Sequence, residues 1–167
     1  MILLTGGSGY IGKYLSNRLD SKSINYISIN RSMIYDGTVY DIIKKESGKG
    51  SILINAAGFT GKPNVDACED LKPECHFANV ELPVRLAEVC ADNKVIFGHI
   101  SSGCIYTGDN EGKGFNEADE PNLSWKYNNC SYYSGTKAKC EELLSTIGAK
   151  YIWRIRMPFN SDIGTAA

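Results

Sequence analysis

The glycine pattern near the N-terminus constrains the fold more than any other stretch of the sequence. Residues 5–12 read Thr-Gly-Gly-Ser-Gly-Tyr-Ile-Gly and follow the apolar run Met1–Leu4 directly. Gly6, Gly9 and Gly12 have the spacing G-x-x-G-x-x-G, a variant of the dinucleotide fingerprint that joins a buried strand to a helix. One glycine permits a tight turn, one lets the backbone approach a pyrophosphate, and one lets the helix pack on the strand.

The residues after the turn have a helical pattern. Leu15 and Leu19 lie one turn apart within the predicted helix 13–19. Tyr10 and Ile11 precede it, so their backbone N–H groups are expected at a helix N-terminus, where free donors and the dipole attract phosphate. An ordinary strand–helix turn is the alternative interpretation.

A P-loop is a second alternative, because Gly7–Lys13 reads G-x-x-x-x-G-K. That motif requires Ser or Thr at the next position, where the hydroxyl binds Mg²⁺. Tyr14 occupies this position, so the sequence argues against a P-loop.

Short apolar runs and helical patterns alternate along the rest of the chain. Strands are predicted at residues 1–4, 26–29, 51–55, 95–100 and 151–156, and helices at 13–19, 40–45, 74–92 and 133–144. Pro83 is the expected irregularity of the longest helix, and residues 109–129 are expected to form a surface loop. This alternation predicts a doubly wound α/β fold, with a parallel sheet covered on both faces and a ligand beyond the carboxyl ends of its strands.

Composition narrows the class of protein. With 18 basic and 19 acidic residues, the sequence gives no electrostatic reason to expect binding to nucleic acid or an anionic membrane. No apolar run approaches the ~20 residues of a membrane span, and the start lacks the features of a signal peptide. Six scattered cysteines without C-x-x-C pairs argue against zinc and a disulfide framework. A reducing, cytoplasmic setting is the default expectation.

Tyr133 and Lys137 are candidates for acid–base chemistry. They lie four residues apart, on one face of a predicted helix. A tyrosine with an ordinary pKa near ~10 is a poor acid–base catalyst at neutral pH, and a nearby lysine charge should lower that pKa. Ser102 follows the strand 95–100, where its hydroxyl could bond a carbonyl oxygen. A chance pair, a turn serine and a packed thiol at Cys104 are the ordinary alternatives.

Taken together, these motifs resemble the extended short-chain dehydrogenases/reductases, a family of nucleotide-sugar epimerases, dehydratases and reductases with a Rossmann fold. The glycine turn, the Asn55–Gly58 turn, Ser102 and the pair Tyr133-x-x-x-Lys137 occur in the order and spacing of that family. The similarity is greatest to the bifunctional 3,5-epimerase/4-reductases of nucleotide-linked L-rhamnose synthesis, the dTDP-4-dehydrorhamnose reductase type. Residues 55–69, 103–106, 117–122 and 154–158 carry it.

The resemblance implies a role for each motif residue. Tyr133 would give a proton to the C4 keto oxygen of a nucleotide-linked 4-keto-6-deoxyhexose, while Lys137 tunes it and binds the nicotinamide ribose. Ser102 would hold the keto oxygen, and Cys104 would exchange protons at the carbons beside the ketone, which is 3,5-epimerisation. Asn79 matches the asparagine that supports the lysine. Gly103 completes the expected substrate contacts, and the further expected cofactor contacts are Ala56, Ala57, Gly58, Thr60 and Pro158.

The end of the second strand departs from the pattern of NAD-binding members. It reads Asn30-Arg31-Ser32, where those members carry Asp or Glu for the ribose 2′-hydroxyl. Because Arg31 could meet a 2′-phosphate instead, the sequence favours NADPH over NADH. A solvent-exposed arginine with no such role is the alternative.

Full-length members of the family continue into a lobe that grips the nucleotide, and residues 164–167 resemble no part of it. We therefore expect one NAD(P)-binding Rossmann domain over residues 1–167, with the substrate lobe missing. The expected function is NADPH-dependent reduction of a UDP- or dTDP-linked 4-keto-6-deoxyhexose, and a homodimer is compatible with it. A catalytically incomplete NAD(P)-binding module and another nucleotide-sugar epimerase or dehydratase are the alternatives. Dehydratases usually carry an acidic residue where this chain has Gly103, which disfavours that activity.

Overall fold

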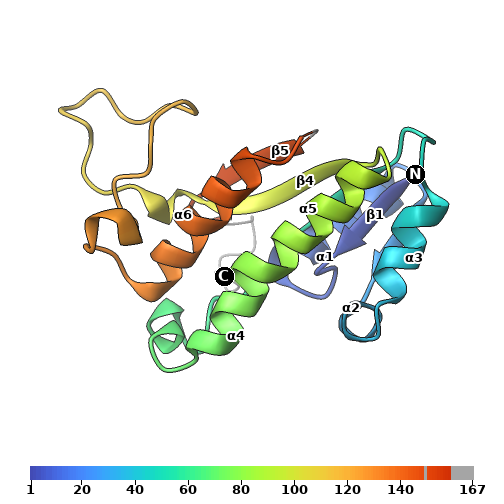
Figure 1. Cartoon of the computed structure of the whole chain (residues 1–167), viewed down its shortest axis with the longest axis horizontal. Helices are drawn as coiled ribbons and strands as arrows, with labels where there is room; N and C mark the ends of the chain where they lie inside the picture. The colour runs from blue at the N-terminus through green and yellow to red at the C-terminus, as the bar shows by residue number, and fades with distance from the viewer. Residues whose placement is uncertain (149, 159–167) are drawn as a thin grey trace.

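A five-stranded parallel sheet forms the centre of the computed structural model, which describes residues 1–148 and 150–158 (Figure 1). Its strands are β1 (Ile2–Thr5), β2 (Tyr26–Ile29), β3 (Ile52–Asn55), β4 (Ile96–Ser102) and β5 (Lys150–Ile155). The strand order is β2-β1-β3-β4-β5, so the chain adds β2 on one side of β1 and every later strand on the other. This reversal is the doubly wound topology, and the predicted fold class is confirmed.

Helices connect the parallel strands. They are α1 (Tyr10–Ser21), α2 (Arg31–Tyr35), α3 (Thr38–Lys45), α4 (Lys72–His76), α5 (Leu82–Asp92) and α6 (Tyr132–Ser145). Right-handed crossovers place α1 on one face and α3, α5 and α6 on the other, because the strand order reverses after β2. The last three helices lie side by side over the sheet in Figure 1, with α5 in contact with both α3 and α6.

The main core lies between the sheet and the layer of α3, α5 and α6. Leu3, Leu53 and Phe97 come from three neighbouring strands in register, and each is at most 1% exposed. Leu86 of α5 and Leu144 of α6 belong to the same apolar cluster. These contacts fix the helices above the strands and therefore fix the loops at the carboxyl ends of the strands.

The helix predicted over residues 74–92 is interrupted as expected near its proline. A π-helical turn, Phe77–Glu81, joins α4 to α5. Pro83 has no N–H to donate to the carbonyl four residues earlier, and the wider turn before it accommodates that loss. The π-helical turn also carries Asn79, whose side chain is fully buried.

Two stretches differ from the simplest predictions. The polar segment after β2 contains the short helix α2, because the Asn30 side chain accepts a hydrogen bond from the Met33 N–H and caps it. The remaining short elements are single 3₁₀ turns at Val65–Cys68, Gly103–Ile105 and Trp125–Tyr127. The last of these lies within the predicted surface loop 109–129, which is otherwise irregular.

Within the described residues no helix is both long enough and apolar enough to cross a membrane.

On β5, Tyr151 and Trp153 stack on one another at 6.2 Å between ring centroids and are 57% and 39% exposed. A Cβ at Gly98 would lie 2.5 Å from the Trp153 ring, so a larger residue there would displace that ring.

Candidate active site

The predicted site residues follow the carboxyl ends of the strands, and a parallel sheet brings all of these ends to one edge. The glycine turn follows β1, the segment Ala56–Thr60 follows β3, and Gly103 and Cys104 follow β4. Pro158, half-buried, comes three residues after β5.

The glycine turn packs directly against the turn that follows β3. Gly6 has a φ of +73°, and a Cβ at this position would lie 2.4 Å from the Ala57 nitrogen. A Cβ on Gly12 would lie 2.0 Å from the Gly6 carbonyl oxygen, so helix α1 can pack here only because both residues are glycine. Gly9 is exposed, and a Cβ added there would have one tight neighbour, the Gly6 carbonyl oxygen at 3.3 Å.

The start of α1 is able to bind an anion. Gly9 is the N-cap residue, and no side chain accepts a hydrogen bond from the first N–H groups of the helix. Tyr10 and Ile11 are the first two helical residues, and both are half-buried. The Tyr10 hydroxyl is buried and has no hydrogen-bond partner among the described residues. A bare, glycine-lined helix terminus at a strand end fits the diphosphate of a dinucleotide.

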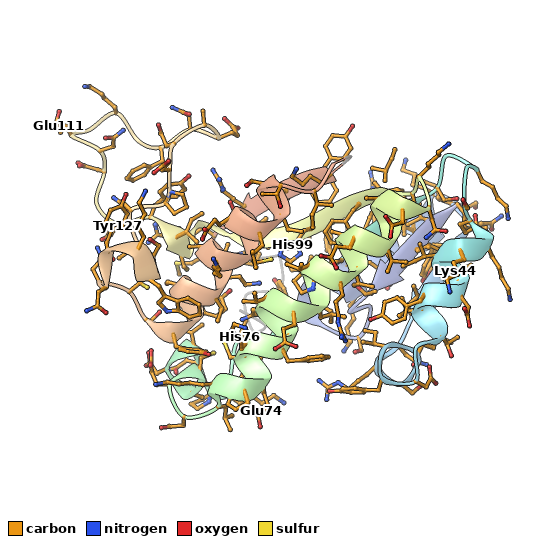
Figure 2. All side chains as sticks on the ribbon, in the orientation of Figure 1. Lys44, Glu74, His76, His99, Glu111 and Tyr127 are labelled. Carbon is orange, nitrogen blue, oxygen red and sulfur yellow. The ribbon has the colours of Figure 1, made fainter. Side chains whose placement is uncertain are left out.

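A buried polar chain links the last residues of β1 and β3 to His99 in the middle of β4. The Asn55 side-chain oxygen accepts hydrogen bonds from the Thr5 hydroxyl at 2.6 Å and from the Ala57 N–H at 3.2 Å. The Asn55 amide nitrogen lies 3.1 Å from Nδ1 of His99, whose Nε2 lies 3.7 Å from the Cys140 sulfur. Figure 2 shows His99 in the middle of the molecule. The sequence analysis missed this chain, although polar residues at one end of buried strands were a usable signal.

Asn79 clamps the segment after β3 to the helical layer. Its amide oxygen accepts a hydrogen bond from the Phe59 N–H at 2.8 Å, and its amide nitrogen donates to the Phe59 carbonyl at 2.9 Å. The amide nitrogen also lies 3.3 Å from the Thr136 hydroxyl on α6. A Cβ on Gly58 would lie 3.3 Å from the Asn79 oxygen and 3.4 Å from Nζ of Lys137. The structure thus brings together three residues predicted at the cofactor site.

Ser102 and Tyr133 are also brought together, from β4 and α6. Both side chains are buried, at 7% and 8% exposure. The Ser102 hydroxyl accepts a hydrogen bond from the Cys104 N–H at 3.2 Å and so caps the following 3₁₀ turn, the ordinary role considered for it. Cys104 in turn packs against Tyr133, so Tyr133 lies beside the 3₁₀ turn that Ser102 caps. Nζ of Lys137 lies 5.8 Å from the centroid of the Tyr133 ring.

Burial, and not a charge, has the largest effect on the pKa of Tyr133 in this geometry. Burial raises the pKa of Tyr133 above its ordinary value, and the Ser102 side chain opposes that shift only in part. Burial also lowers the pKa of the Lys137 ammonium. The phenol therefore keeps its proton at neutral pH, which is the state in which tyrosine can act as an acid.

Cys104 lies beside Tyr133, in a small apolar cluster. It is half-buried and packs against Tyr133 together with Cys68 and Cys75, both of which are fully buried. Burial, helped by a hydrogen bond with the Cys75 thiol, raises the pKa of Cys68 to about 12, which keeps that thiol neutral. The sequence analysis did not place Cys68 and Cys75 near the tyrosine. Among these three cysteines only Cys104 reaches solvent.

The segment Asn30-Arg31-Ser32 begins helix α2 at the end of β2. The Asn30 side chain accepts hydrogen bonds from the Met33 N–H and from the Ser32 hydroxyl, so it is used in capping. Arg31, the first residue of α2, is exposed. The guanidinium is therefore free to reach a ligand from this position, and its predicted role stays a prediction.

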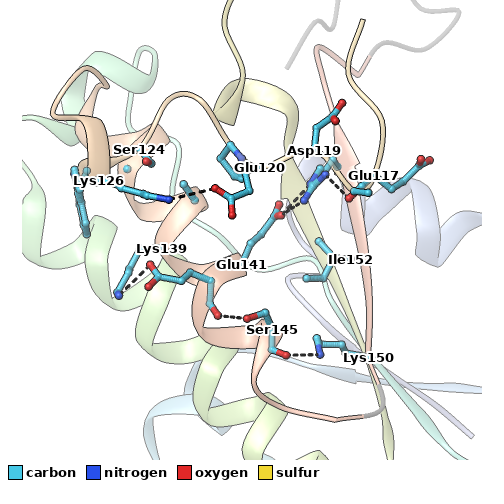
Figure 3. A pocket seen from close by; sticks show the side chains of 17 residues that line it. Glu117, Asp119, Glu120, Ser124, Lys126, Lys139, Glu141, Ser145, Lys150 and Ile152 are labelled. Carbon is cyan, nitrogen blue, oxygen red and sulfur yellow. Dashed lines mark hydrogen bonds and ion pairs between the residues drawn. The ribbon is translucent and has the colours of Figure 1, made fainter. Parts of the chain in front are cut away.

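Two cavities lie on the α6 side of the sheet. One of about 330 Å³ opens beside Gly103 and is lined by Arg156 and by Tyr106 and Phe115, whose rings stack at 4.4 Å. A larger one of about 770 Å³ lies between α6, β5 and the loop 117–126 (Figure 3). None of the predicted catalytic residues lines the larger cavity, so we base the candidate site on the strand ends instead.

The doubly wound sheet, the glycine turn after β1 and the Ser102–Tyr133–Lys137 cluster define an extended short-chain dehydrogenase/reductase. Comparison with known proteins gives the particular family. The chain belongs to the family described as the RmlD substrate binding domain, whose model matches residues 1–162.

Curated relatives from Arabidopsis thaliana are similar over most of this chain. A bifunctional dTDP-4-dehydrorhamnose 3,5-epimerase/dTDP-4-dehydrorhamnose reductase is 37% identical over an aligned length of 167, and the alignment covers 96% of this chain and 53% of the relative. A trifunctional UDP-glucose 4,6-dehydratase/UDP-4-keto-6-deoxy-D-glucose 3,5-epimerase/UDP-4-keto-L-rhamnose-reductase is 37% identical over an aligned length of 168, and the alignment covers 96% of this chain and 24% of that protein. The chain thus spans at most about half the length of these two relatives.

Solved structures share the fold. A UDP-rhamnose synthase from Acanthamoeba polyphaga mimivirus superposes with a TM-score of 0.81 at 26% identity, covering 95% of this chain and 56% of that chain. A dTDP-4-dehydrorhamnose reductase from Bacillus anthracis, solved in complex with NADP, gives a TM-score of 0.70 at 16% identity and covers 95% and 54% of the two chains.

Proposed function

We propose that this chain carries the cofactor half and the carbonyl chemistry of an NADPH-dependent reductase for a nucleotide-linked 4-keto-6-deoxyhexose. The observation that carries the proposal is the meeting of Ser102, Tyr133 and Lys137 at the same sheet edge as the glycine turn. Membership of the RmlD family and the activities for which the relatives are named support it. The product would be a nucleotide-linked L-rhamnose.

Ser102, Tyr133 and Lys137 would each have a separate role in the reduction of the C4 carbonyl. NADPH, when bound, supplies the hydride. Ser102 holds the keto oxygen by a hydrogen bond from its hydroxyl, and Tyr133 delivers the proton from its phenol to that oxygen. The raised pKa of Tyr133 keeps the phenol protonated, so it carries the proton that it delivers. Lys137, buried beside Gly58, would meet the cofactor ribose and the phenolate that remains after proton transfer.

Epimerisation at C3 and C5 is the proposed second activity, with Cys104 as the base. The C4 ketone acidifies the hydrogens on its neighbouring carbons, so a thiolate beside Ser102 can remove one of them. Cys104 is two residues from Ser102 and partly open to solvent, whereas Cys68 and Cys75 are buried. Replacing Cys104 with Ser should abolish deuterium incorporation at C3 and C5 in D₂O.

A direct assay tests the reductase. The purified chain is mixed with NADPH and with dTDP- or UDP-4-keto-6-deoxyglucose, and the absorbance of the reduced nicotinamide is followed. We expect it to fall with one of the two sugars, and to fall no faster than the background for the Tyr133→Phe variant. Unchanged absorbance with both sugars would overturn the proposal.

A cofactor-binding module without turnover is the second candidate. It is favoured by one fact, that the chain spans about half the length of its bifunctional relative. Calorimetric titration with NADPH, run on the sample used for the turnover assay, separates the two functions. Binding without turnover supports the module, and binding with turnover supports the reductase.

A further inference from the structure

Glu141 of α6 is a buried carboxylate that belongs to none of the motifs of the candidate site. It lies one helical turn beyond Lys137 and two turns beyond Tyr133, and its side chain is 6% exposed. An uncompensated carboxylate at this depth would be strongly unfavourable, so its partners define its role. In Figure 3 the side chain points from α6 toward the loop that carries Glu117 and Asp119.

Both carboxylate oxygens of Glu141 are engaged by the neighbouring strands. Oε1 accepts a hydrogen bond of 2.5 Å from the Ser101 hydroxyl on β4. Oε2 accepts from Nε of Arg154 on β5 at 2.9 Å and lies 2.7 Å from Nη2 of the same guanidinium. Two guanidinium nitrogens thus hold one carboxylate oxygen, and charge-assisted contacts of this kind are the strong ones. One helix residue is bonded to two adjacent strands.

The guanidinium is held in turn by the loop after β4. Nη1 of Arg154 donates to the Tyr106 hydroxyl at 2.7 Å and to the Glu117 carbonyl at 3.2 Å. The Tyr106 hydroxyl donates to the Asp119 carbonyl at 2.7 Å. With this support, Arg154 cannot move to follow a displaced Glu141 without losing other bonds. The bridge between α6 and the strands is therefore rigid.

The bridge ends one residue before Ser102. Ser101 pairs with Arg154 in the sheet, and Ser102 is the next residue of β4. Tyr133 and Glu141 are eight residues apart on the same helix. The distance between the Ser102 hydroxyl and the Tyr133 phenol is consequently set by how closely α6 sits on β4 at this level.

We propose that Glu141 is a positioning residue, which holds α6 against Ser101 and Arg154 so that Tyr133 keeps its place beside the turn that Ser102 caps. The catalytic consequence rests on the proposed reductase function. The placement of Tyr133 does not, and it can be measured without turnover. A bridge with only a stability role would leave the state of Tyr133 unchanged.

The test compares Glu141→Gln with Glu142→Gln. Glu142 is the next residue of α6, but its side chain is 70% exposed and pairs with Lys139 on the surface. Protein labelled with ¹³Cζ-tyrosine is titrated by NMR, and the Tyr133 resonance is assigned from the Tyr133→Phe variant. Ser102 favours the phenolate form of Tyr133. A shift of Tyr133 away from Ser102 should therefore raise the measured Tyr133 pKa in Glu141→Gln, and Glu142→Gln should leave it unchanged.

Kinetics provides the second readout. If the reductase function holds, Glu141→Gln should lower kcat about 10-fold or more, because small errors in placing a proton donor are costly, while the Kd for NADPH stays within about twofold. If no variant and no wild-type sample turns over, the reductase proposal fails and the titration still decides the role of Glu141.

Ser101→Ala is a second test variant, for use if Glu141→Gln does not fold. It removes one bond of the bridge and leaves the ion pair of Glu141 with Arg154 intact. We expect the same direction of change in the Tyr133 titration, with smaller size. An unshifted Tyr133 titration in a folded Glu141→Gln sample, or in Ser101→Ala if Glu141→Gln is unfolded, would overturn the proposal.

Discussion

The backbones at Gly6 and Ala57 approach so closely that a Cβ on residue 6 would lie 2.4 Å from the Ala57 nitrogen. This contact joins the turn after β1 to the turn after β3, the two neighbouring strands at which the order of the sheet reverses. In doubly wound folds a dinucleotide lies over this crevice. The shape of the proposed cofactor site therefore depends on residue 6 being a glycine, which has no Cβ.

Replacing Gly6 with Ala should destabilise the protein well beyond the effect of backbone strain alone. The matched control is Gly48→Ala, because Gly48 also has a positive φ, +70°, but a Cβ added there would have no atom within 4 Å. We expect a loss of about 1 kcal/mol for Gly48→Ala and of more than about 3 kcal/mol for Gly6→Ala, measured by denaturant unfolding. Equal losses would show that the contact with Ala57 costs nothing to disturb.

Removing the Asn79 side chain should loosen the segment after β3. Asn79→Ala leaves both polar groups of the Phe59 backbone without their partner, which should lower the free energy of unfolding by about 2–4 kcal/mol. Asn93→Ala serves as the control, because the Asn93 side chain donates a single hydrogen bond, to the Val89 carbonyl near the end of α5. It should cost about 1 kcal/mol. A small effect of Asn79→Ala would mean that the clamp is dispensable.

Stability should fall in mild acid because of His99. Burial, with the Lys137 charge adding to it, holds the pKa of His99 well below its ordinary value. Below about pH 6.5 the unfolded chain therefore binds a proton that the folded chain does not, and the stabilisation present above that pH is lost as pH falls. This group alone should contribute a slope of up to about 1.4 kcal/mol per pH unit.

The measurement is the free energy of unfolding of wild type and His99→Gln at about pH 7.5 and 5.5. The variant should show a shallower dependence on pH, whatever its absolute stability. His76→Gln is the control, because His76 is the other of the two histidines in the sequence and has a side chain that is 37% exposed. The same slope in wild type and His99→Gln would contradict the prediction.

Arg31 should discriminate between the two nicotinamide cofactors. If its guanidinium meets the 2′-phosphate, Arg31→Ala should weaken NADPH about 10-fold or more, because it removes a charge-assisted contact, and should leave NADH within about twofold. Calorimetric titration with each cofactor gives both affinities. Arg18→Ala, at an exposed position in the last turn of α1, should change neither. Equal losses for both cofactors would remove the assignment of NADPH.

Tyr133 should be far more important for turnover than its neighbour. Tyr133→Phe removes the proposed proton donor and should lower kcat by about 10²–10⁴. Tyr132→Phe is a matched control, since the Tyr132 ring packs beside Trp125, at 5.4 Å between centroids, and has no proposed part in the reaction. It should retain kcat within about threefold. If both variants keep the wild-type rate, Tyr133 is not the acid.

The sequence by itself determined the fold class, the strand ends at which the site lies and the residues that mark it. Glycine spacing, the alternation of apolar runs with helical patterns, and the spacing of Tyr133 and Lys137 are local properties that need no knowledge of distant contacts. The irregularity near Pro83 was predictable for the same reason, because a missing N–H acts within one helical turn.

Only the tertiary structure decided the electrostatics of the site. The direction of the Tyr133 pKa shift could not be deduced from the spacing of Tyr133 and Lys137, because burial of the phenol by other elements raises that pKa. The Thr5–Asn55–His99 chain and the bonds of Glu141 to Ser101 and Arg154 join residues far apart in the sequence. Such contacts exist only once the sheet has assembled, since strand register and helix packing bring the partners together.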